Sequence, residues 1–290
     1  MRITSTFMND LELKSGEYHA VSFKDSALLK KFRVQLRNFF RNSLRDDSDY
    51  LYILNENDEI INKKKFELIS FDCNIINLQD DKYTEKLVKD LLFDQLENQP
   101  ELLEAHLDLN RAVEKFVSDI EIQTEGIMIE FDKNERSIQR FIQSLDIIIS
   151  CDENEDIPNY IIREFLIRTL MKLNKQRKEI ILMLSFPETD LGFYEFKKFI
   201  DLLKQLKVTT IVLTNEFDFI EAASLDCAFL IDENGNKYDI LNLEKEIKAF
   251  ELDDQDSSMS LARKLAFTEF RGDFSLLDSQ WKRFLESSKC

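Results

Sequence analysis

Glycine and proline are scarce in this chain, which contains five glycines and three prolines in 290 residues. These two residues supply most tight turns, so their scarcity excludes collagen-like chains and all-β designs with many turns. It favours long helices instead. The hydrophobic share is 43%, with 24 phenylalanines, which is enough for a real core. We therefore expect one large folded domain or two smaller ones, with little disorder.

Continuous apolar runs in the last part of the chain predict buried strands. The clearest runs, residues 179–184 and 208–213, lack the alternation of a half-exposed strand and suit strands covered on both faces. Residues 146–151 indicate a third strand of this kind. Helical patterns at 157–175 and 189–206 separate these runs, and such alternation is typical of a mostly parallel sheet with helices packed on it.

The first part of the chain also mixes strands and helices. In order, its patterns predict a strand at 18–23, a helix at 26–45, and strands at 50–54 and 66–71. Further on, Asn234-Gly235 is a strong hairpin signal between residues 227–231 and 237–240. After residue 251, an acidic break precedes two short helices.

A helical segment interrupts the α/β pattern. Residues 80–120 contain no glycine and only Pro100, which suits the first turn of a second helix, so we expect two long helices in a hairpin. The expected organisation has four parts. Residues 1–76 and 145–250 form an α/β head, residues 77–144 a helical leg, and residues 251–290 a helical C-terminal extension.

Motifs for nucleotide binding and hydrolysis are absent from the sequence. A phosphate-binding loop ends in Gly-Lys-Ser/Thr, and none of the five glycines precedes a lysine. No two glycines lie within ten residues, which excludes a dinucleotide fingerprint. The only histidines, His19 and His106, are far apart, fit no metalloprotease motif and are read as ordinary surface or core residues. These absences favour a protein that is not an enzyme.

The net charge and the cysteines further limit the kinds of protein that this chain can be. The chain has 39 basic and 56 acidic residues, a net charge of −17, so it is not a general polycation that coats nucleic acid. Its four cysteines form no C-x-x-C pair, so neither a disulfide framework nor a zinc knuckle is indicated. No signal peptide is apparent, and the longest apolar run, residues 180–184, is too short to span a bilayer. We expect a cytoplasmic protein with reduced thiols.

Basic residues are concentrated in the predicted helix at 26–45. This segment holds six basic and no acidic residues, so it carries +6 and the other 270 residues carry −23. The six are Lys30, Lys31, Arg33, Arg37, Arg41 and Arg45. The arginines recur every four residues and thus lie close to one line on a helix, where like charges repel. A polyanion would relieve this repulsion; a solvated face, or pairing with acids elsewhere, is the alternative.

A second basic patch runs through the predicted helix at 157–175 and just beyond its end. Its members are Arg163, Arg168, Lys172, Lys175, Arg177 and Lys178, with Glu164 as the only acid. Cations at a helix C-terminus also complement the helix dipole, which explains the last three without a ligand. Arg163 and Arg168 remain candidates for contacts with phosphate.

An acidic cluster surrounds Gly126. Six carboxylates fall within 17 residues: Asp119, Glu121, Glu125, Glu130, Asp132 and Glu135. Carboxylates gathered on a helix end and an extended stretch can chelate a hard cation such as Ca²⁺, although the pattern is not that of an EF-hand. A solvated acidic surface and a metal-dependent nuclease site are the alternatives.

Several stretches, in this order along the chain, resemble the small accessory adaptation protein of type II-A CRISPR systems, the Csn-two family. They are residues 126–132 followed by 141–145, then 178–184 and 208–213. The resemblance spans roughly residues 15–242. It implies a degenerate P-loop-like head without a working phosphate loop, interrupted by a helical leg. Residues 251–290 extend beyond the short members of the family.

The resemblance also implies a function. It implies a homotetrameric ring that takes double-stranded DNA ends through a positively lined hole, with Ca²⁺ holding the leg in place. The role is in spacer acquisition, beside the CRISPR integrase and the effector nuclease. Glu130 and Asp132 match acidic positions next to the family's calcium-binding region, whereas the spacing from Asp132 to Phe141 is two residues longer here. The alternative is an acidic α/β adaptor that binds only protein.

Overall fold

The computed structural model describes residues 1–41, 49–73, 82–118, 123–124, 127–128, 138–145, 159–173, 179–250, 255–274 and 277–287. The chain divides into two compact units. Unit 1 comprises Met1–Ile76 and Asn174–Cys290, and unit 2 comprises Asn77–Leu173. Unit 1 therefore draws on both ends of the chain, whereas unit 2 is one continuous segment.

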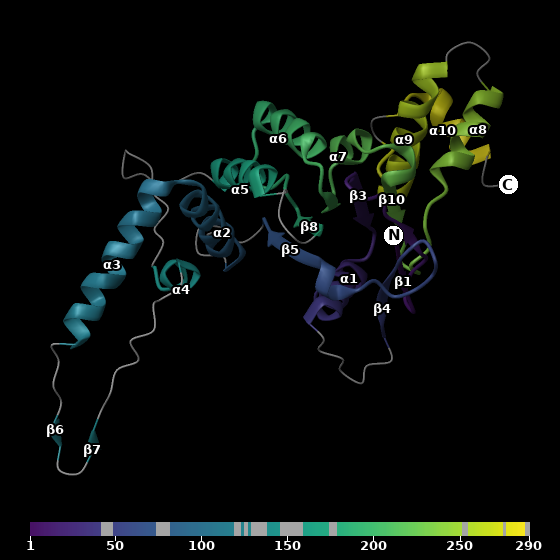
Figure 1. Ribbon diagram of the computed structural model, residues 1–290. Helices are drawn as coiled ribbons and strands as arrows, with labels where there is room; N and C mark the ends of the chain where they lie inside the picture. The colour runs from purple at the N-terminus through teal and green to yellow at the C-terminus, as the bar shows by residue number, and fades with distance from the viewer. Residues whose placement is uncertain are drawn as a thin grey trace. The chain divides into compact units, whose positions relative to one another are not determined.

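Unit 1 is built around a five-stranded sheet in which all neighbouring strands are parallel (Figure 1). The strands, in spatial order, are β10 (Ala228–Ile231), β3 (Tyr18–Phe23), β9 (Thr209–Leu213), β8 (Glu179–Ser185) and β5 (Phe66–Asp72). Every residue of β3, β9 and β10 is buried, because helices cover both faces of the sheet. The predicted α/β class, with a mostly parallel sheet and inserted helices, is confirmed.

Helix α1 (Ser26–Arg41) covers one face of this sheet. Beyond it lies a small antiparallel sheet formed by β2 (Leu11–Glu12), β1 (Arg2–Ser5) and β4 (Leu51–Leu54). Phe32 and Leu36 of α1 are fully buried in one core with Ile3 and Ile53 of the small sheet. This core fixes which side of α1 is left for polar contacts.

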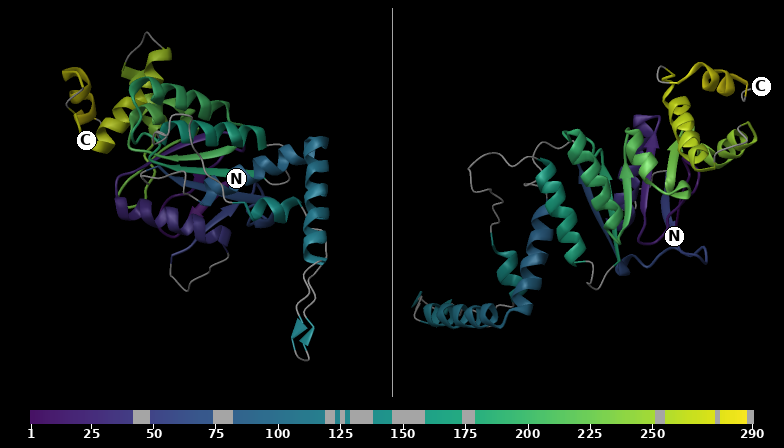
Figure 2. Two further views of the ribbon diagram at one scale, coloured as in Figure 1. Left: turned by 90° about the vertical axis from the view of Figure 1, so that its left-hand side faces the viewer. Right: turned by 90° about the horizontal axis from the view of Figure 1, so that it is seen from above.

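Helices cover the other face and one end of unit 1. They are α6 (Phe193–Gln205), α7 (Phe217–Ala222), α8 (Ile240–Phe250), α9 (Gln255–Arg271) and α10 (Ser279–Ser287). Helices α6 and α7 lie on the side of the sheet opposite α1 (Figures 1 and 2). Helix α9 packs on α7 through Phe267 and Phe217, whose ring centroids are 5.6 Å apart. Phe284 and Leu285 of α10 are buried.

The predicted hairpin after β10 is reduced to a turn. Gly235 occupies the left-handed region with φ of 82°, and one antiparallel bridge joins Ile231 to Lys237. The chain then enters α8 at Ile240, a helix that the sequence analysis did not predict. Two short 3-10 helices complete unit 1: η1 (Lys63–Lys65) and η3 (Leu225–Cys227).

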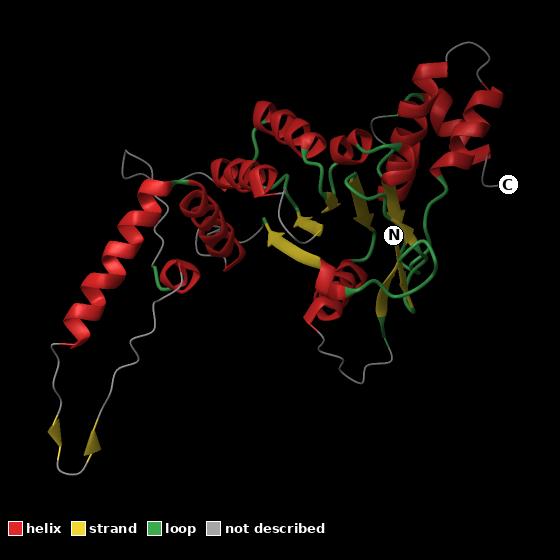
Figure 3. Ribbon diagram, viewed as in Figure 1, coloured by secondary structure: helices red, strands yellow, loops and turns green. Residues whose placement is uncertain are grey.

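Unit 2 is mainly helical (Figure 3). Its elements are α2 (Lys82–Asn98), α3 (Pro100–Ser118), the short strand pair β6 (Gln123–Thr124) and β7 (Ile127–Met128), α4 (Ile138–Gln143) and α5 (Asn159–Leu173). Pro100 is the first residue of α3, as predicted. Helix α2 contacts α3, α4 and α5, so α5 belongs to this unit, whereas the expected division assigned residues 145–250 to the head. The predicted strand at 146–151 lies outside the described residues.

None of the helices in the described ranges has the length and apolar character needed to cross a membrane.

Candidate nucleic-acid interface

Two residues, Lys24 and Asp25, separate the end of β3 from the start of the basic helix α1. Asp25 caps it: the Ala27 amide donates to Asp25 Oδ1 at 2.9 Å, and the Leu29 amide donates to the Asp25 carbonyl at 3.1 Å. Such a cap satisfies amide groups that a helix N-terminus otherwise leaves open. Where P-loop proteins present glycine amides to phosphate, this chain presents Lys24 and a carboxylate.

The same edge of the sheet carries a second acid. Glu188 follows β8 and accepts a hydrogen bond from the Asn215 amide at 2.9 Å, at the edge where α/β sheets usually bind ligands. Burial raises the pKa of the Glu188 carboxyl, and the hydrogen bond from Asn215 opposes part of that rise. Glu188 thus adds a second partly buried carboxyl to the edge at which Asp25 caps α1.

Two arginines of the α1 row point at strand β5. Arg33 forms an ion pair with Asp72, the last residue of β5, and the two side chains are 17% and 20% exposed. Arg37 donates to the Ser70 hydroxyl from Nε at 3.1 Å and from Nη2 at 2.8 Å, and Ser70 is 2% exposed. These arginines connect α1 to β5 inside the unit. Two of the four arginines in the predicted row, Arg33 and Arg37, are therefore paired with other residues of the protein.

The remaining basic residues of α1 are more accessible. Lys30 and Arg41 are exposed. Lys31 pairs with Asp49 at 2.7 Å, and its ammonium lies 4.7 Å from the centre of the Phe7 ring. Arg45 lies outside the described residues. The outward charge of α1 is thus concentrated at its two ends.

Three lysines that the sequence analysis overlooked adjoin the C-terminal end of α1. They form η1, Lys63–Lys65, and Asn62 caps this turn by accepting a bond from the Lys64 amide at 3.1 Å. The Lys63 ammonium lies 4.3 Å from the centre of the Phe39 ring of α1. Lys64 and Lys65 are exposed. The sequence feature that could have revealed them is the run of three consecutive lysines, which a search for residues at helical spacing does not detect.

The two candidate arginines of the second basic patch, Arg163 and Arg168, lie in unit 2 and differ in their exposure. Arg163 is 3% exposed, so it presents no surface to a ligand in this conformation. Arg168 pairs with Glu164 one turn earlier on α5, with Nη2 at 2.7 Å and Nε at 2.9 Å from the same carboxylate oxygen. A pair at this spacing stabilises the helix itself by a few tenths of a kcal/mol.

The candidate calcium ligands lie outside the described residues. This applies to Asp119, Glu121, Glu125, Glu130 and Asp132. Within the described ranges, no group of three or more His, Cys, Asp or Glu side chains is close enough to hold a metal ion. The calcium site at the acidic cluster around Gly126 therefore stays a prediction from the sequence.

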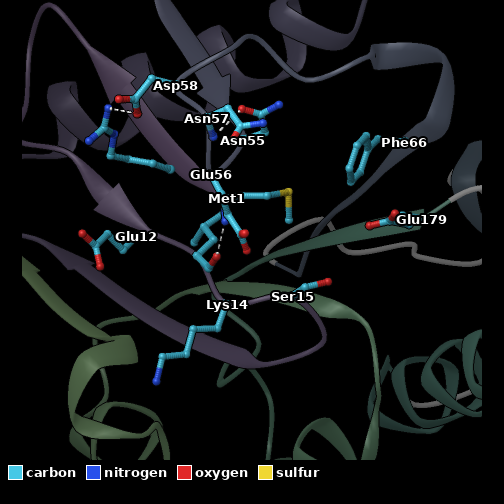
Figure 4. Close-up of a pocket in the computed structure, with 12 residues that line it drawn as sticks. Met1, Glu12, Lys14, Ser15, Asn55, Glu56, Asn57, Asp58, Phe66 and Glu179 are labelled. Carbon is cyan, nitrogen blue, oxygen red and sulfur yellow. Dashed lines mark hydrogen bonds and ion pairs between the residues drawn. The ribbon is translucent and has the colours of Figure 1, made fainter.

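A cavity of about 790 Å³ opens at the opposite, amino-terminal edge of the sheet (Figure 4). Phe66 and Glu179, the first residues of β5 and β8, contribute to its lining, together with the turn that contains Asn57 and Asp58. Arg2 forms ion pairs with Asp58 at 2.7 Å and with Asp10 at 3.3 Å. The other side-chain cation in the lining, Lys14, pairs with Asp226, so both lining cations are already paired.

Comparison with known proteins identifies a fold but no family. No protein-family model matches the sequence, and no curated protein matches it significantly. The crystal structure of Stu0660 of Streptococcus thermophilus is similar, with a TM-score of 0.66 at 12% identity over 100% of both chains. The structure of cbiO1 from Clostridium perfringens, part of the ABC transporter complex cbiONQ, gives a TM-score of 0.39 at 13% identity, over 87% of this chain and 90% of that one. That second score is too low to carry an argument. The chain thus shares the fold of Stu0660 along its whole length, C-terminal helices included.

Proposed function

We propose that this protein binds double-stranded DNA ends without regard to sequence, as a ring-shaped homotetramer stabilised by Ca²⁺, during CRISPR spacer acquisition. In that role it acts beside the CRISPR integrase and the effector nuclease and performs no catalysis itself. The likeness of residues 126–132, 141–145, 178–184 and 208–213 to the Csn-two family supports this proposal. The whole-length similarity in fold to Stu0660 is consistent with it.

The observation that carries the DNA-binding part is the segregation of charge. A chain with a net charge of −17 has poor overall attraction to DNA, so binding requires a local positive field. Helix α1 has five basic and no acidic residues, and three further lysines adjoin its end. Contacts from such a surface go to phosphates, which makes binding strong at low salt and independent of sequence.

The absence of catalysis is supported by the carboxylates of Asp25 and Glu188 at the carboxyl edge of the sheet. Both are placed where a bound nucleotide would need cations or open amides. We expect neither ATP binding nor hydrolysis. DNA-stimulated turnover of ATP would contradict this part of the proposal.

A second candidate is an acidic α/β adaptor that binds only protein. The Arg33–Asp72 and Arg37–Ser70 contacts favour it, because they show that part of the basic row serves the fold. The two candidates differ in their behaviour towards DNA, since an adaptor of this charge has no salt-dependent affinity for a duplex.

The deciding experiment compares linear duplex with covalently closed circles of the same sequence. A ring that loads over ends binds the linear form and not the circle, with affinity that falls steeply as salt rises. Equal binding to both removes threading, and no binding to either leaves the adaptor. Light scattering on the same samples, with and without Ca²⁺, gives the mass; a value near 34.4 kDa in all conditions contradicts the ring. Cleavage of the duplex with Mg²⁺ or Mn²⁺ would identify a nuclease instead.

A further inference from the structure

The basic residues around α1 differ in what they contact, and this difference separates two roles. Arg33 and Arg37 hold β5 through Asp72 and Ser70, and both are partly buried. Their guanidinium groups are partly engaged inside the unit, so they have less to offer a phosphate than a fully exposed cation. The cations available to a ligand are therefore to be found elsewhere on this surface.

Exposed cations meet where η1 lies against the end of α1. The contact of the Lys63 ammonium with the Phe39 ring places the three lysines of η1 beside the last turn of α1, where Arg41 is exposed. Neither Arg41, Lys64 nor Lys65 forms an ion pair with any residue that the structure describes. We call Arg41, Lys63, Lys64 and Lys65 the composite patch.

The composite patch lies among residues that contain no acid, which is unusual in so acidic a chain. The chain has 56 acids and 39 bases, yet the segment Asn62–Phe66 and the whole of α1 contain no acid. Cations at a helix C-terminus gain from the helix dipole, but that gain is limited to the last turn. It suits Lys63, which packs on the Phe39 ring of the helix, whereas Lys64 and Lys65 are exposed.

We propose that the composite patch is the surface of this chain that contacts the phosphates of duplex DNA, and that Arg33 and Arg37 are positioning residues that fix α1 on β5. This inference rests on the proposed function. The charge of the patch complements a duplex, which offers one phosphate charge per roughly 1.7 Å of axis. The exposed ammonium groups of Lys64 and Lys65 suit contacts with phosphate rather than base readout.

The test uses the full chain and the charge-neutral variant Lys64→Gln with Lys65→Gln. Because both side chains are exposed, this variant keeps the fold. We expect its affinity for a linear duplex at about 0.1 M salt to fall at least about tenfold, and the slope of log K against log salt to decrease by about two. The matched control is Lys197→Gln with Lys204→Gln, which removes the same charge from the exposed side of α6. We expect the affinity and the salt slope of this control to stay within about twofold of the original values.

Each outcome distinguishes the inference from the proposed function. If the original protein binds and the Lys64/Lys65 variant binds equally well, the patch is not the contact surface, although DNA binding stands. If both double variants lose affinity equally, the effect is one of net charge, and the inference is wrong. Displacement of the duplex by poly-glutamate at equal charge would assign the patch to an acidic protein partner. If the original protein binds no duplex at all, the proposed function fails, and the inference fails with it.

Discussion

Arg33 in the middle of α1 and Asp72 at the last position of β5 form an ion pair that is mostly shielded from water. Exposures of 17% and 20% mean that each charge has lost most of its hydration, which the partner's charge replaces in part. The pair joins a helix to a strand that lies almost 40 residues further along the chain. It therefore contributes to tertiary structure and not merely to the helix.

Arg33→Ala or Asp72→Ala should each lower the free energy of unfolding by roughly 1–3 kcal/mol, because the remaining charge stays partly buried without its partner. The double variant should cost clearly less than the sum. Urea unfolding, followed through the single tryptophan, Trp281, measures this coupling in unit 1. Lys24→Ala, which breaks an exposed pair with Glu233 in the same unit, serves as the control and should change stability by less than about 0.5 kcal/mol. Strict additivity at Arg33 and Asp72 would show that the pair contributes nothing.

Gly235 cannot be replaced without moving a neighbouring loop. Its φ is +82°, and a Cβ would lie 2.2 Å from the Phe7 carbonyl oxygen and 2.7 Å from Met8 Cα. Gly272 has a similar φ of +71° with nothing within 4 Å of that position. We expect Gly272→Ala to cost about 1 kcal/mol for the backbone conformation alone, and Gly235→Ala to cost at least about 2 kcal/mol more. Equal shifts in the midpoint of unfolding would mean that the loop moves freely away.

His19 should make stability depend on pH. Its Nε2 accepts a hydrogen bond from the Lys14 amide at 2.9 Å, so the neutral ring is the form that fits. Burial lowers the pKa of His19, and the hydrogen bond to the Thr210 carbonyl opposes part of this shift. The folded pKa lies below the unfolded one, so the unfolded state binds the proton first. The contribution of the neutral ring is complete above about pH 6.5 and is lost as the pH falls from there through the folded pKa.

His19→Gln should therefore be less stable than the original at pH 7.5, and the difference should shrink towards pH 5. The slope of that difference is at most about 1.4 kcal/mol per pH unit. Urea unfolding at half-unit steps of pH measures it. Because the carboxylates are common to both proteins, their titration cancels in the comparison. A difference that is constant with pH would mean that His19 does not titrate in this range.

Calcium should stabilise the chain through the acidic cluster. Addition of Ca²⁺ should raise the melting temperature, and Glu130→Ala with Asp132→Ala should abolish most of the rise, because Ca²⁺ relieves the repulsion between these carboxylates. Differential scanning calorimetry with Ca²⁺ and with a chelator checks this. Glu104→Ala with Glu114→Ala removes two exposed acids of α3 and should leave the shift unchanged. An unaltered shift in the first variant would place the site elsewhere.

The buried strands were predictable from the sequence for a physical reason. A parallel strand covered on both faces needs apolar side chains on both, which gives the continuous runs of β8 and β9. The strands β1 and β2 carry no such run, since they have four and two residues. Strand β2 pairs only with β1, and β1 also pairs with β4, some 50 positions away. The signal of Asn234-Gly235 for a turn was correct, but the pairing across it stops at Tyr238, because α8 begins at Ile240.

The candidate interface was predictable only in part. Spacing shows that the arginines of α1 share a line, but the partner that this line meets is set by the packing of α1 on β5. The lysines of η1 lie more than 20 residues beyond α1, and only the contact between Lys63 and Phe39 brings the two together. The calcium ligands rest on the sequence alone, because they lie outside the described residues.

The order of strands in unit 1 has a consequence for its synthesis. Strand β3 lies between β9 and β10, and the bond from His19 to Thr210 spans 191 positions. At about 5–20 residues per second, the ribosome makes Thr210 roughly 10–40 s after His19. Throughout that interval β3 has no neighbouring strand, while all of unit 2 emerges. The inserted unit is therefore synthesised before the sheet that carries it can form, and β3 stays without a strand partner until β9 and β10 have been made.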